Sequence, residues 1–408
     1  MNRLVLIGNG FDLAHDLKTS YKDFICWYWE KKWHEMAITY NPVCEDELCK
    51  FEIIGGNSKL WHNIYLDNYL RIKELKAIDI INLIIKDKNR FSFKPAKFFE
   101  NILKSIETKG WVDIENEYYR LLEYNTIEHH YEKEVAKLNK QLQYLQELLT
   151  EYLITISQQD IRLNDIIKKK IYEPIKSSDI SIEASTKLKD HIEWCKEQDN
   201  KVWELKFYYY GINGFRTGEI YDVDKFKDSP TDCSEYPRAY MLPENIMLLD
   251  FNYTKTVQVY LIKDKDIFSH IHIHGQLEKP KEIIFGYGDE FDDKYKKLQA
   301  LNNNECLTNI KTIRYQESDN YRKVLHFIES APFQVCIMGH SCGNSDRTLL
   351  NTIFEHRNCI SIKPYYYKKE DGTDNYIELI QNISRNFKDM KLMRDRVVNK
   401  LYCEALTE

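Results

Sequence analysis

Leu4-Val5-Leu6-Ile7-Gly8-Asn9-Gly10-Phe11-Asp12 is the stretch of the 408-residue sequence that decides the fold class. Four aliphatic residues in succession form the pattern of a buried β-strand, and the two glycines that follow them indicate a tight loop. We therefore expect residues 4–7 to form a strand whose carboxyl end runs directly into a loop at residues 8–10.

The C-terminal part of the chain repeats this pattern, because apolar runs alternate there with segments of helical periodicity. The expected strands are residues 246–251, 267–273, 283–285, 335–338 and 359–367, and the expected helices are residues 346–356 and 375–387. Strands that alternate with helices are typical of a parallel, doubly wound sheet. We therefore predict an α/β fold with a Rossmann-like parallel sheet, which the N-terminal strand joins.

Between these two parts lies a long region that is poor in glycine and proline and is predicted to be mainly helical. We accordingly assign residues 1–55 and 240–408 to a discontinuous α/β core and residues 56–239 to a helical insert. The clearest helix of the insert has apolar residues at alternating spacings of three and four, namely Val135, Leu138, Leu142, Leu145, Leu149, Tyr152 and Ile156. This stripe fits a helical hairpin packed on its own domain, which we favour, or the seam of a coiled-coil homo-oligomer.

Composition excludes several classes of protein. Apolar residues make up 43% of the chain and charged residues 30%, as in globular proteins. The formal net charge of −6 argues against nucleic-acid binding through bulk charge. No apolar run approaches the ~20 residues of a membrane span, and no signal-peptide pattern is present. The ten cysteines include no C-x-x-C pair, so we expect a reduced, cytoplasmic protein that makes no contact with a membrane.

Four segments rich in Gly, Asn, His or Asp directly follow apolar runs. They are residues 8–12, 251–254, 272–275 and 339–343. An open α/β sheet binds its ligand at the carboxyl ends of its parallel strands. We therefore expect the four segments to line one shared cleft.

The first of these loops differs from the dinucleotide fingerprint, because Leu13 stands where G-x-G-x-x-G requires its third glycine. Gly8 and Gly10 still allow backbone N–H groups to approach a phosphate that a Cβ would obstruct. Asp12 either caps the helix that follows or takes part in catalysis.

His270, His272 and His274 alternate with isoleucines, so a regular strand would present all three on one face. The outer two would then lie ~13 Å apart, too far to share a zinc ion with bonds of ~2 Å. Two neighbouring histidines with a carboxylate from elsewhere remain an alternative metal site. We favour the interpretation in which no metal is bound and His274, next to the flexible Gly275, is a lone catalytic residue.

Residues 339–343, GHSCG, match the G-x-S-x-G motif of a hydrolase nucleophile elbow. The only histidine after Ser341 is His356, and both acids between them would lie on the same helix as that histidine. No Ser-acid-His triad can therefore assemble. We expect instead a strand-to-helix loop that faces an anion, with Ser345 as the N-cap and Asp346 in the first helical turn.

One further motif, WVDIE at residues 111–115, falls in the helical region. Helical spacing places Trp111, Glu115 and Tyr118 on one face. Taken alone, this pattern also fits an ordinary half-buried amphipathic helix.

In combination, these motifs resemble the bacterial abortive-infection AbiH family. LVLIGNGFDLAH at residues 4–15 and TSYKDF at residues 19–24 look like the opening of AbiH proteins. The segments at residues 111–115, 251–254, 272–275 and 338–346 fall in the same order as the later blocks of that family. The resemblance brackets nearly the whole chain and implies a role in antiphage defence, with a phage-derived protein as the trigger.

The AbiH family in turn resembles, more distantly, the sirtuin-like, DHS-type NAD-binding fold. With this resemblance, we predict contacts to NAD or a related nucleotide at Gly8, Asn9, Gly10, Phe11, Thr19, Asp23, Phe24, Thr254, Gly275, Gly339, His340, Ser341 and Asp346. Two departures matter. The Asn-x-Asp of sirtuin-like proteins is Asn252-Tyr253-Thr254 here, and the zinc-binding cysteines of deacylating sirtuins are absent. Hydrolysis of NAD is therefore a more natural inference than protein deacylation.

Cleavage of the bond between nicotinamide and ribose passes through an oxocarbenium-like centre, as glycoside hydrolysis does. His274 is the candidate base, because a histidine titrates near neutral pH. Asn252 would orient the ribose hydroxyls or the water, and Asp12 or Glu115 would supply negative charge. Two alternatives stay open: a nucleotide-binding sensor without catalysis, and a metal-dependent nuclease that uses the strand histidines.

Overall fold

A computed structural model describes residues 1–39, 41–54, 91–109, 113–129, 131–198, 236, 238–261 and 268–408. Trp111 and much of the segment assigned to the helical insert, residues 56–239, lie outside these residues. Among the described residues, no helix combines the length and the apolar composition that crossing a lipid bilayer requires.

The main sheet has five strands, all parallel, in the order β6-β5-β1-β7-β8. Their bounds are Asn2–Ile7 for β1, Ile246–Asp250 for β5, Phe268–His272 for β6, Phe333–Met338 for β7 and Cys359–Tyr365 for β8. The N-terminal strand is central, and it pairs directly with strands that come more than 200 residues later in the chain. The predicted α/β class with a parallel sheet is confirmed.

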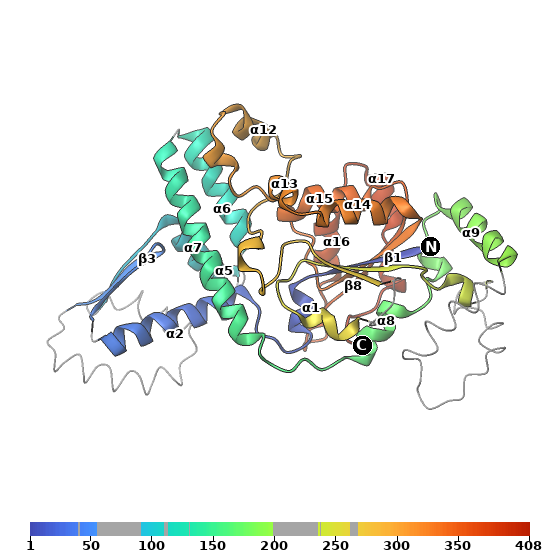
Figure 1. Ribbon diagram of the computed structural model, residues 1–408, viewed down its shortest axis with the longest axis horizontal. Helices are drawn as coiled ribbons and strands as arrows, with labels where there is room; N and C mark the ends of the chain where they lie inside the picture. The colour runs from blue at the N-terminus through green and yellow to red at the C-terminus, as the bar shows by residue number, and fades with distance from the viewer. Residues whose placement is uncertain are drawn as a thin grey trace.

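Alternate side chains of the central strand point into two different cores, as the two-residue period of a strand requires. Leu4 and Leu6 pack in a cluster with residues of α14 (Asn320–Ser330), α15 (Arg347–Phe354), α16 (Tyr376–Arg385) and α17 (Met390–Arg396). Val5 and Ile7 pack in a cluster with residues of α1 (Asn9–Leu13), α8 (Asp165–Tyr172) and η4 (Thr256–Tyr260). Figure 1 shows these two helical layers on opposite sides of β1 and β8.

Residues 283–285 form irregular backbone, so the strand expected there is wrong. Ile283, Ile284 and Phe285 are nevertheless buried, at 4% exposure or less. The backbone N–H of Ile284 bonds the carbonyl of His274, whereas Ile283 and Ile284 pack into different cores. The apolar run at residues 283–285 therefore predicted burial correctly, but these residues do not pair in a β-sheet.

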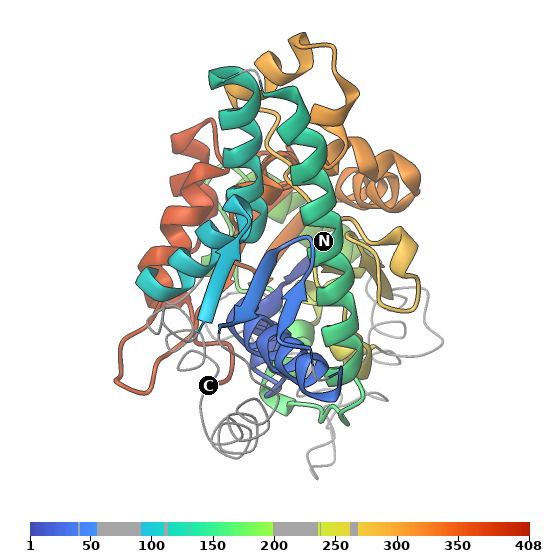
Figure 2. The ribbon, with the colours of Figure 1, turned by 90° about the vertical axis from the view of Figure 1, so that its left-hand side faces the viewer.

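A second unit lies beside the α/β layers, as Figures 1 and 2 show. Its helices are α2 (Tyr21–Thr39), α5 (Lys97–Lys109), α6 (Ile114–Glu123) and α7 (Glu132–Ile156), and its antiparallel sheet consists of β2 (Val43–Glu45), β3 (Cys49–Ile53) and β4 (Phe91–Pro95). We did not expect this sheet. In this sheet, β3 comes from residues 1–55, assigned to the core, and pairs with β4, from residues 56–239, assigned to the insert. Residues of both segments pack in one apolar cluster.

The apolar stripe of α7 is buried within the chain. Its residues from Val135 to Tyr152 are at most 5% exposed, and they pack in the cluster that also contains α2 and α6. This burial is what the hairpin interpretation expected, and it leaves no free seam for a coiled-coil dimer along this stripe.

The remaining elements are short. They are η1 (Tyr124–Glu128, a π-helix), η2 (Ser177–Asp179), α9 (Ser185–Glu197), η3 (Arg238–Met241), η5 (Pro280–Glu282), α12 (Asp293–Ala300), η6 (Asn304–Leu307), α13 (Lys311–Arg314), η7 (Tyr315–Glu317), η8 (Asn344–Asp346) and η9 (Lys400–Tyr402).

Candidate functional site

A cleft of about 580 Å³ lies at the carboxyl ends of β1, β5, β6 and β7. Loops after all four strands contribute to it, and α6 and α7 of the second unit close one side. Its lining residues include Gly8, Asn9, Gly10, Asp12, Thr19, Tyr21, Asp113, Glu115, Asn252, Tyr253, Thr254, His274, Lys311, Gly339, His340, Ser341, Ser345 and Asp346. The volume falls in the range typical of small-molecule sites.

The glycines of the first loop let two loops of the cleft pack tightly together. A Cβ on Gly8 would lie 2.5 Å from the Cα of His340, and one on Gly339 would lie 2.1 Å from the backbone N of Phe11. The N–H groups of Gly8 and Gly10 already bond the carbonyls of Met338 and Gly339. These two N–H groups therefore hold the neighbouring loop, and a phosphate contact by other N–H groups of this loop stays a prediction.

Asp12 is buried in α1, at 1% exposure, and it lines the cleft. The hydroxyl of Thr254 donates a 2.7 Å hydrogen bond to its Oδ2, while its Oδ1 has no hydrogen-bond partner among the described residues. Burial raises the pKa of Asp12 to about 7. The N-cap of α1 is Gly8, so the capping alternative for Asp12 is excluded.

Asn252 follows β5 and is held at both ends. Its backbone N–H bonds Oδ1 of Asp250 at 2.9 Å, and its side-chain Nδ2 donates to the carbonyl of Gly8 at 3.0 Å. The side chain therefore links the loop after β5 to the loop after β1 and lies in the cleft with a defined orientation.

His274 belongs to a buried charge network. Its Nε2 lies 3.2 Å from Oδ1 of Asp346 and 3.2 Å from the hydroxyl of Tyr315. Lys311 donates to the same Asp346 oxygen at 2.8 Å and to Oε2 of Glu115 at 2.9 Å. Two carboxylates and one lysine, all below 10% exposure, therefore surround the histidine side of the cleft.

The network shifts the pKa values of its members in different directions. Burial, together with the charge of Lys311, lowers the pKa of His274 to about 4. Burial raises the pKa of Glu115 to about 7, although Lys311 opposes this. Burial would also raise the pKa of Asp346, but Lys311 and His274 hold it well below its ordinary value. At neutral pH, His274 is therefore neutral and Asp346 is charged.

Glu115 is fixed near the start of α6. Asp113 caps that helix through a 2.9 Å bond from the N–H of Asn116, and Oε1 of Glu115 accepts the N–H of Gly286 at 3.1 Å. The acidic motif predicted from the sequence therefore reaches the cleft from the helical unit.

The structure brings all the predicted site residues to the cleft except four. Phe11 and Phe24 are fully buried in apolar cores. Asp23 exchanges hydrogen bonds with Ser20 at the start of α2. Gly275 forms a turn with φ +84°, where a Cβ would lie 2.5 Å from the carbonyl of Glu282. These four residues shape the segments around the cleft.

The loop at residues 339–343 contains no triad. Ser341 is exposed, whereas His356 bonds Glu329 at 3.1 Å at the far end of α15. The expected N-cap at Ser345 is wrong, because Asp346 occupies the N-cap position of α15, without a capping hydrogen bond from its side chain. Its carboxylate contacts the lysine and the histidine of the cleft rather than the helix backbone.

Sequence reasoning missed Lys311, which lies at the start of α13 and is 1% exposed. It also missed Asn382 and Arg385 of α16 on the cleft lining, where Asn382 donates to the carbonyl of Ser341. These residues carry no local motif. They could be found only from the partners that the fold gives them.

The three alternating histidines do not lie in one place. His270 and His272 are in β6 and contact Asp250, whereas the strand ends before His274, which enters the cleft. The expectation of one shared face is therefore wrong for His274. Neither His270 nor His272 lines the cleft, and both are mostly buried, which argues against a nuclease centre built on them.

No curated protein and no solved structure matches this chain. Residues 4–367, however, match the family described as "Bacteriophage abortive infection AbiH", a match that begins in β1 and runs beyond β8. The chain therefore belongs to the bacteriophage abortive-infection AbiH family.

Proposed function

We propose that the protein acts in phage abortive infection by binding NAD or a related nucleotide and hydrolysing its nicotinamide–ribose bond. The observation that carries this proposal is the convergence of Asp12, Asn252 and His274 in one cleft of suitable size. Family membership supports the abortive-infection role. The chemistry is argued below from the side chains.

Hydrolysis breaks the bond between the ribose C1′ and the nicotinamide nitrogen, and the bonding pair leaves with the nicotinamide. Water attacks C1′ as positive charge develops on the ribose, as in glycoside hydrolysis. Asp12 is the better base for that water, because its pKa of about 7 matches the working pH. Its Oδ1, unpartnered among the described residues, would accept the proton.

His274 then has a positioning role in place of the base role that we first expected. A pKa of about 4 makes it a weak base at neutral pH. Asp346 and Tyr315 hold its Nε2, so the neutral ring has a fixed orientation beside the substrate. We assign to it, with Asn252, the orientation of the ribose hydroxyls. Asp346 and Glu115 would stabilise the developing positive charge.

Asp12 also supplies a carboxylate near the position where the Asn-x-Asp pattern of sirtuin-like proteins has its acid. Thr254 occupies the place of that acid, and its hydroxyl bonds the carboxylate of Asp12. A carboxylate therefore does lie beside Asn252, but it comes from α1. If this replacement supports binding without turnover, the protein is a nucleotide sensor.

Release of nicotinamide from NAD by the purified full-length chain tests the proposal. Asp12→Asn should lower turnover by about 100-fold or more while NAD binding by calorimetry persists. The exposed Asp16 offers a matched control, and Asp16→Asn should retain full activity. Binding of NAD without any nicotinamide release would favour the sensor, and the absence of NAD binding would exclude NAD as the ligand of either function.

A further inference from the structure

Three ligand-type side chains outside the cleft come together on neighbouring strands of the main sheet. In the parallel register of β5 and β6, Leu248 lies opposite His270 and Asp250 lies opposite His272. Residues two apart in a strand share a face, so Asp250, His270 and His272 all point to the side of the sheet on which Leu248 packs. This arrangement follows from the strand pairing itself.

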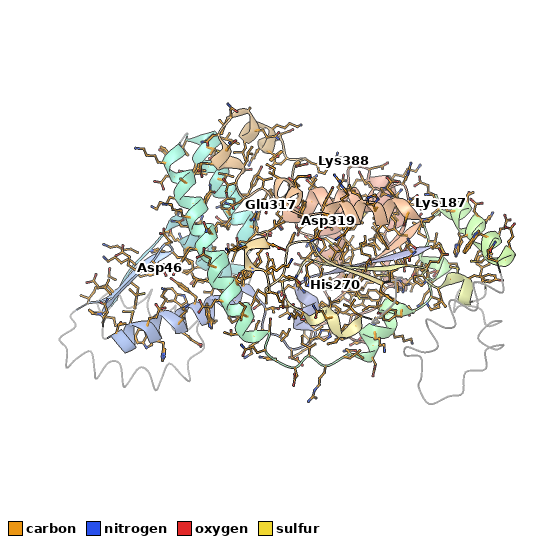
Figure 3. All side chains as sticks on the ribbon, viewed as in Figure 1. Asp46, Lys187, His270, Glu317, Asp319 and Lys388 are labelled. Atoms are coloured by element: carbon orange, nitrogen blue, oxygen red, sulfur yellow. The ribbon has the colours of Figure 1, made fainter. Side chains whose placement is uncertain are left out.

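The three side chains are close together and shielded from solvent. Oδ2 of Asp250 lies 3.2 Å from Nε2 of His270 and 3.5 Å from Nδ1 of His272. One donor atom from each of the three residues lies within 4.8 Å of the other two. The side chains are 1%, 12% and 9% exposed, respectively, and His270 lies within the α/β layers (Figure 3).

His272 has one ring nitrogen in use and one without a partner. Its Nδ1 lies 2.9 Å from the backbone carbonyl of Asn252, which can only accept, so Nδ1 carries the proton. Nε2 of the neutral ring is then a lone pair. It is buried and has no hydrogen-bond partner among the described residues. A buried polar atom without a partner is costly, and such an atom calls for an explanation.

A metal ion bound by Nε2 would satisfy this lone pair. Histidines that bind metals typically donate their other ring N–H to a backbone carbonyl or a carboxylate, as His272 does here. Asp250 uses Oδ1 for the N–H of Asn252 and keeps Oδ2 on the histidine side.

We propose that Asp250, His270 and His272 bind one divalent transition-metal ion, with zinc the best fit to two imidazoles and one carboxylate. Zinc bonds of about 2.0–2.2 Å place ligand atoms about 3.3 Å apart in a tetrahedron. The ligand atoms of the three residues now lie within 4.8 Å of one another, so the longest of these separations would shorten by somewhat more than an ångström on zinc binding. Three protein ligands leave the fourth position to water.

The ion would act on the cleft through Asn252. The backbone N–H and carbonyl of Asn252 bond Asp250 and His272, which are two of the three ligands. An ion that fixes both ligands also fixes Asn252, a cleft residue. We therefore assign the ion a positioning role, and the assignment of the site does not depend on the reaction proposed for the cleft.

Zinc titration of the metal-free full-length chain, in competition with a chromophoric chelator, tests the site. We expect one zinc per chain with a Kd in the micromolar range or below, and cobalt should give the visible absorption of a nitrogen- and oxygen-ligated ion. His270→Ala and Asp250→Asn should each weaken zinc binding by about 100-fold. His326, an exposed histidine of α14, provides the matched control, and His326→Ala should bind zinc as the wild type does.

His272→Ala also removes the bond to Asn252, so melting curves must accompany it. If that variant does not fold, His270→Ala decides, because the contact of His270 with Asp250 is made by side chains alone. Saturating zinc should raise the Tm of the wild type by about 3 °C and leave that of His270→Ala unchanged. Substoichiometric binding by the wild type, or equal affinity in His270→Ala, would overturn the proposal.

Discussion

The hydroxyl of Thr254 donates a 2.7 Å hydrogen bond to the carboxylate of Asp12, although 242 residues separate the two in the chain. The contact joins the loop after β5 to the helix after β1, two strands that are neighbours in the sheet. The other carboxylate oxygen of Asp12 is buried and has no hydrogen-bond partner among the described residues. The predictions about catalysis depend on this oxygen.

The activity should depend on pH through Asp12. A base must be deprotonated to accept a proton, and the pKa of Asp12 is about 7. We therefore expect kcat/KM for NAD to rise as pH increases through about 7 and to level off above it. Asp12→Asn should lose this acid limb together with most of the activity. A pH profile measured between 5 and 9 checks the prediction, and a limb that survives in Asp12→Asn would assign the base elsewhere.

His274→Ala should abolish nicotinamide release while leaving the fold and NAD binding largely intact. The ring lines the cleft, and its hydrogen bonds go to side chains. His272→Ala should cost stability more than chemistry, because its ring holds the carbonyl of Asn252. Nicotinamide release and thermal melts of both variants provide the measurement. Full activity in His274→Ala would remove this residue from the mechanism.

Ser341→Ala should leave any hydrolytic activity within a factor of about ten of the wild type. The serine is exposed, and His356, the only histidine after it in the chain, pairs with Glu329 at 3.1 Å. This histidine is therefore not available as the base of a Ser-acid-His triad. The same nicotinamide assay measures the effect, and a loss of about a thousandfold would show that the serine acts as a nucleophile.

The sequence allowed the main sheet and most of the cleft to be predicted, because both depend on local patterns. Apolar runs marked four strands besides β1, and polar residues directly after them marked the loops that line the cleft. The antiparallel sheet β2-β3-β4 was missed, since its strands are short and one comes from a distant segment. Pairing between distant segments leaves little trace in local sequence.

The errors within the site have a similar cause. Lys311 is central to the charge network, yet its partners Glu115 and Asp346 lie 196 and 35 residues away. Phe11 and Phe24 were assigned to the ligand through a family resemblance, whereas their side chains fill the cores beneath the loops. A motif shows which segment matters, but not which of its side chains face the cleft.

Gly339→Ala should destabilise the protein severely. Gly339 has φ +76°, and a Cβ there would lie 2.1 Å from the backbone N of Phe11. Gly372 provides a matched control, since it has φ +82° but nothing within 4 Å of the added Cβ. Gly372→Ala should cost only the ~1–2 kcal/mol of the left-handed conformation. Gly339→Ala should cost about 3 kcal/mol more, because the backbone of Phe11 cannot move aside. Urea unfolding of both variants measures the difference, and equal costs would contradict the close packing of the two loops.

Lys311→Met should destabilise the protein by about 3–5 kcal/mol, because it leaves Glu115 and Asp346 buried without their cation. The loss of unfolding free energy caused by Lys311→Met should grow with pH. Without the lysine, the pKa of Glu115 should exceed its present value of about 7, so the folded state retains a proton that the unfolded state releases near pH 4.5. Stability should therefore fall as pH rises above 4.5. Glu115→Gln combined with Lys311→Met should cost less than the sum of the single changes. Urea unfolding at pH 6 and pH 9 tests this coupling, and strictly additive, pH-independent losses would show that the two residues do not interact.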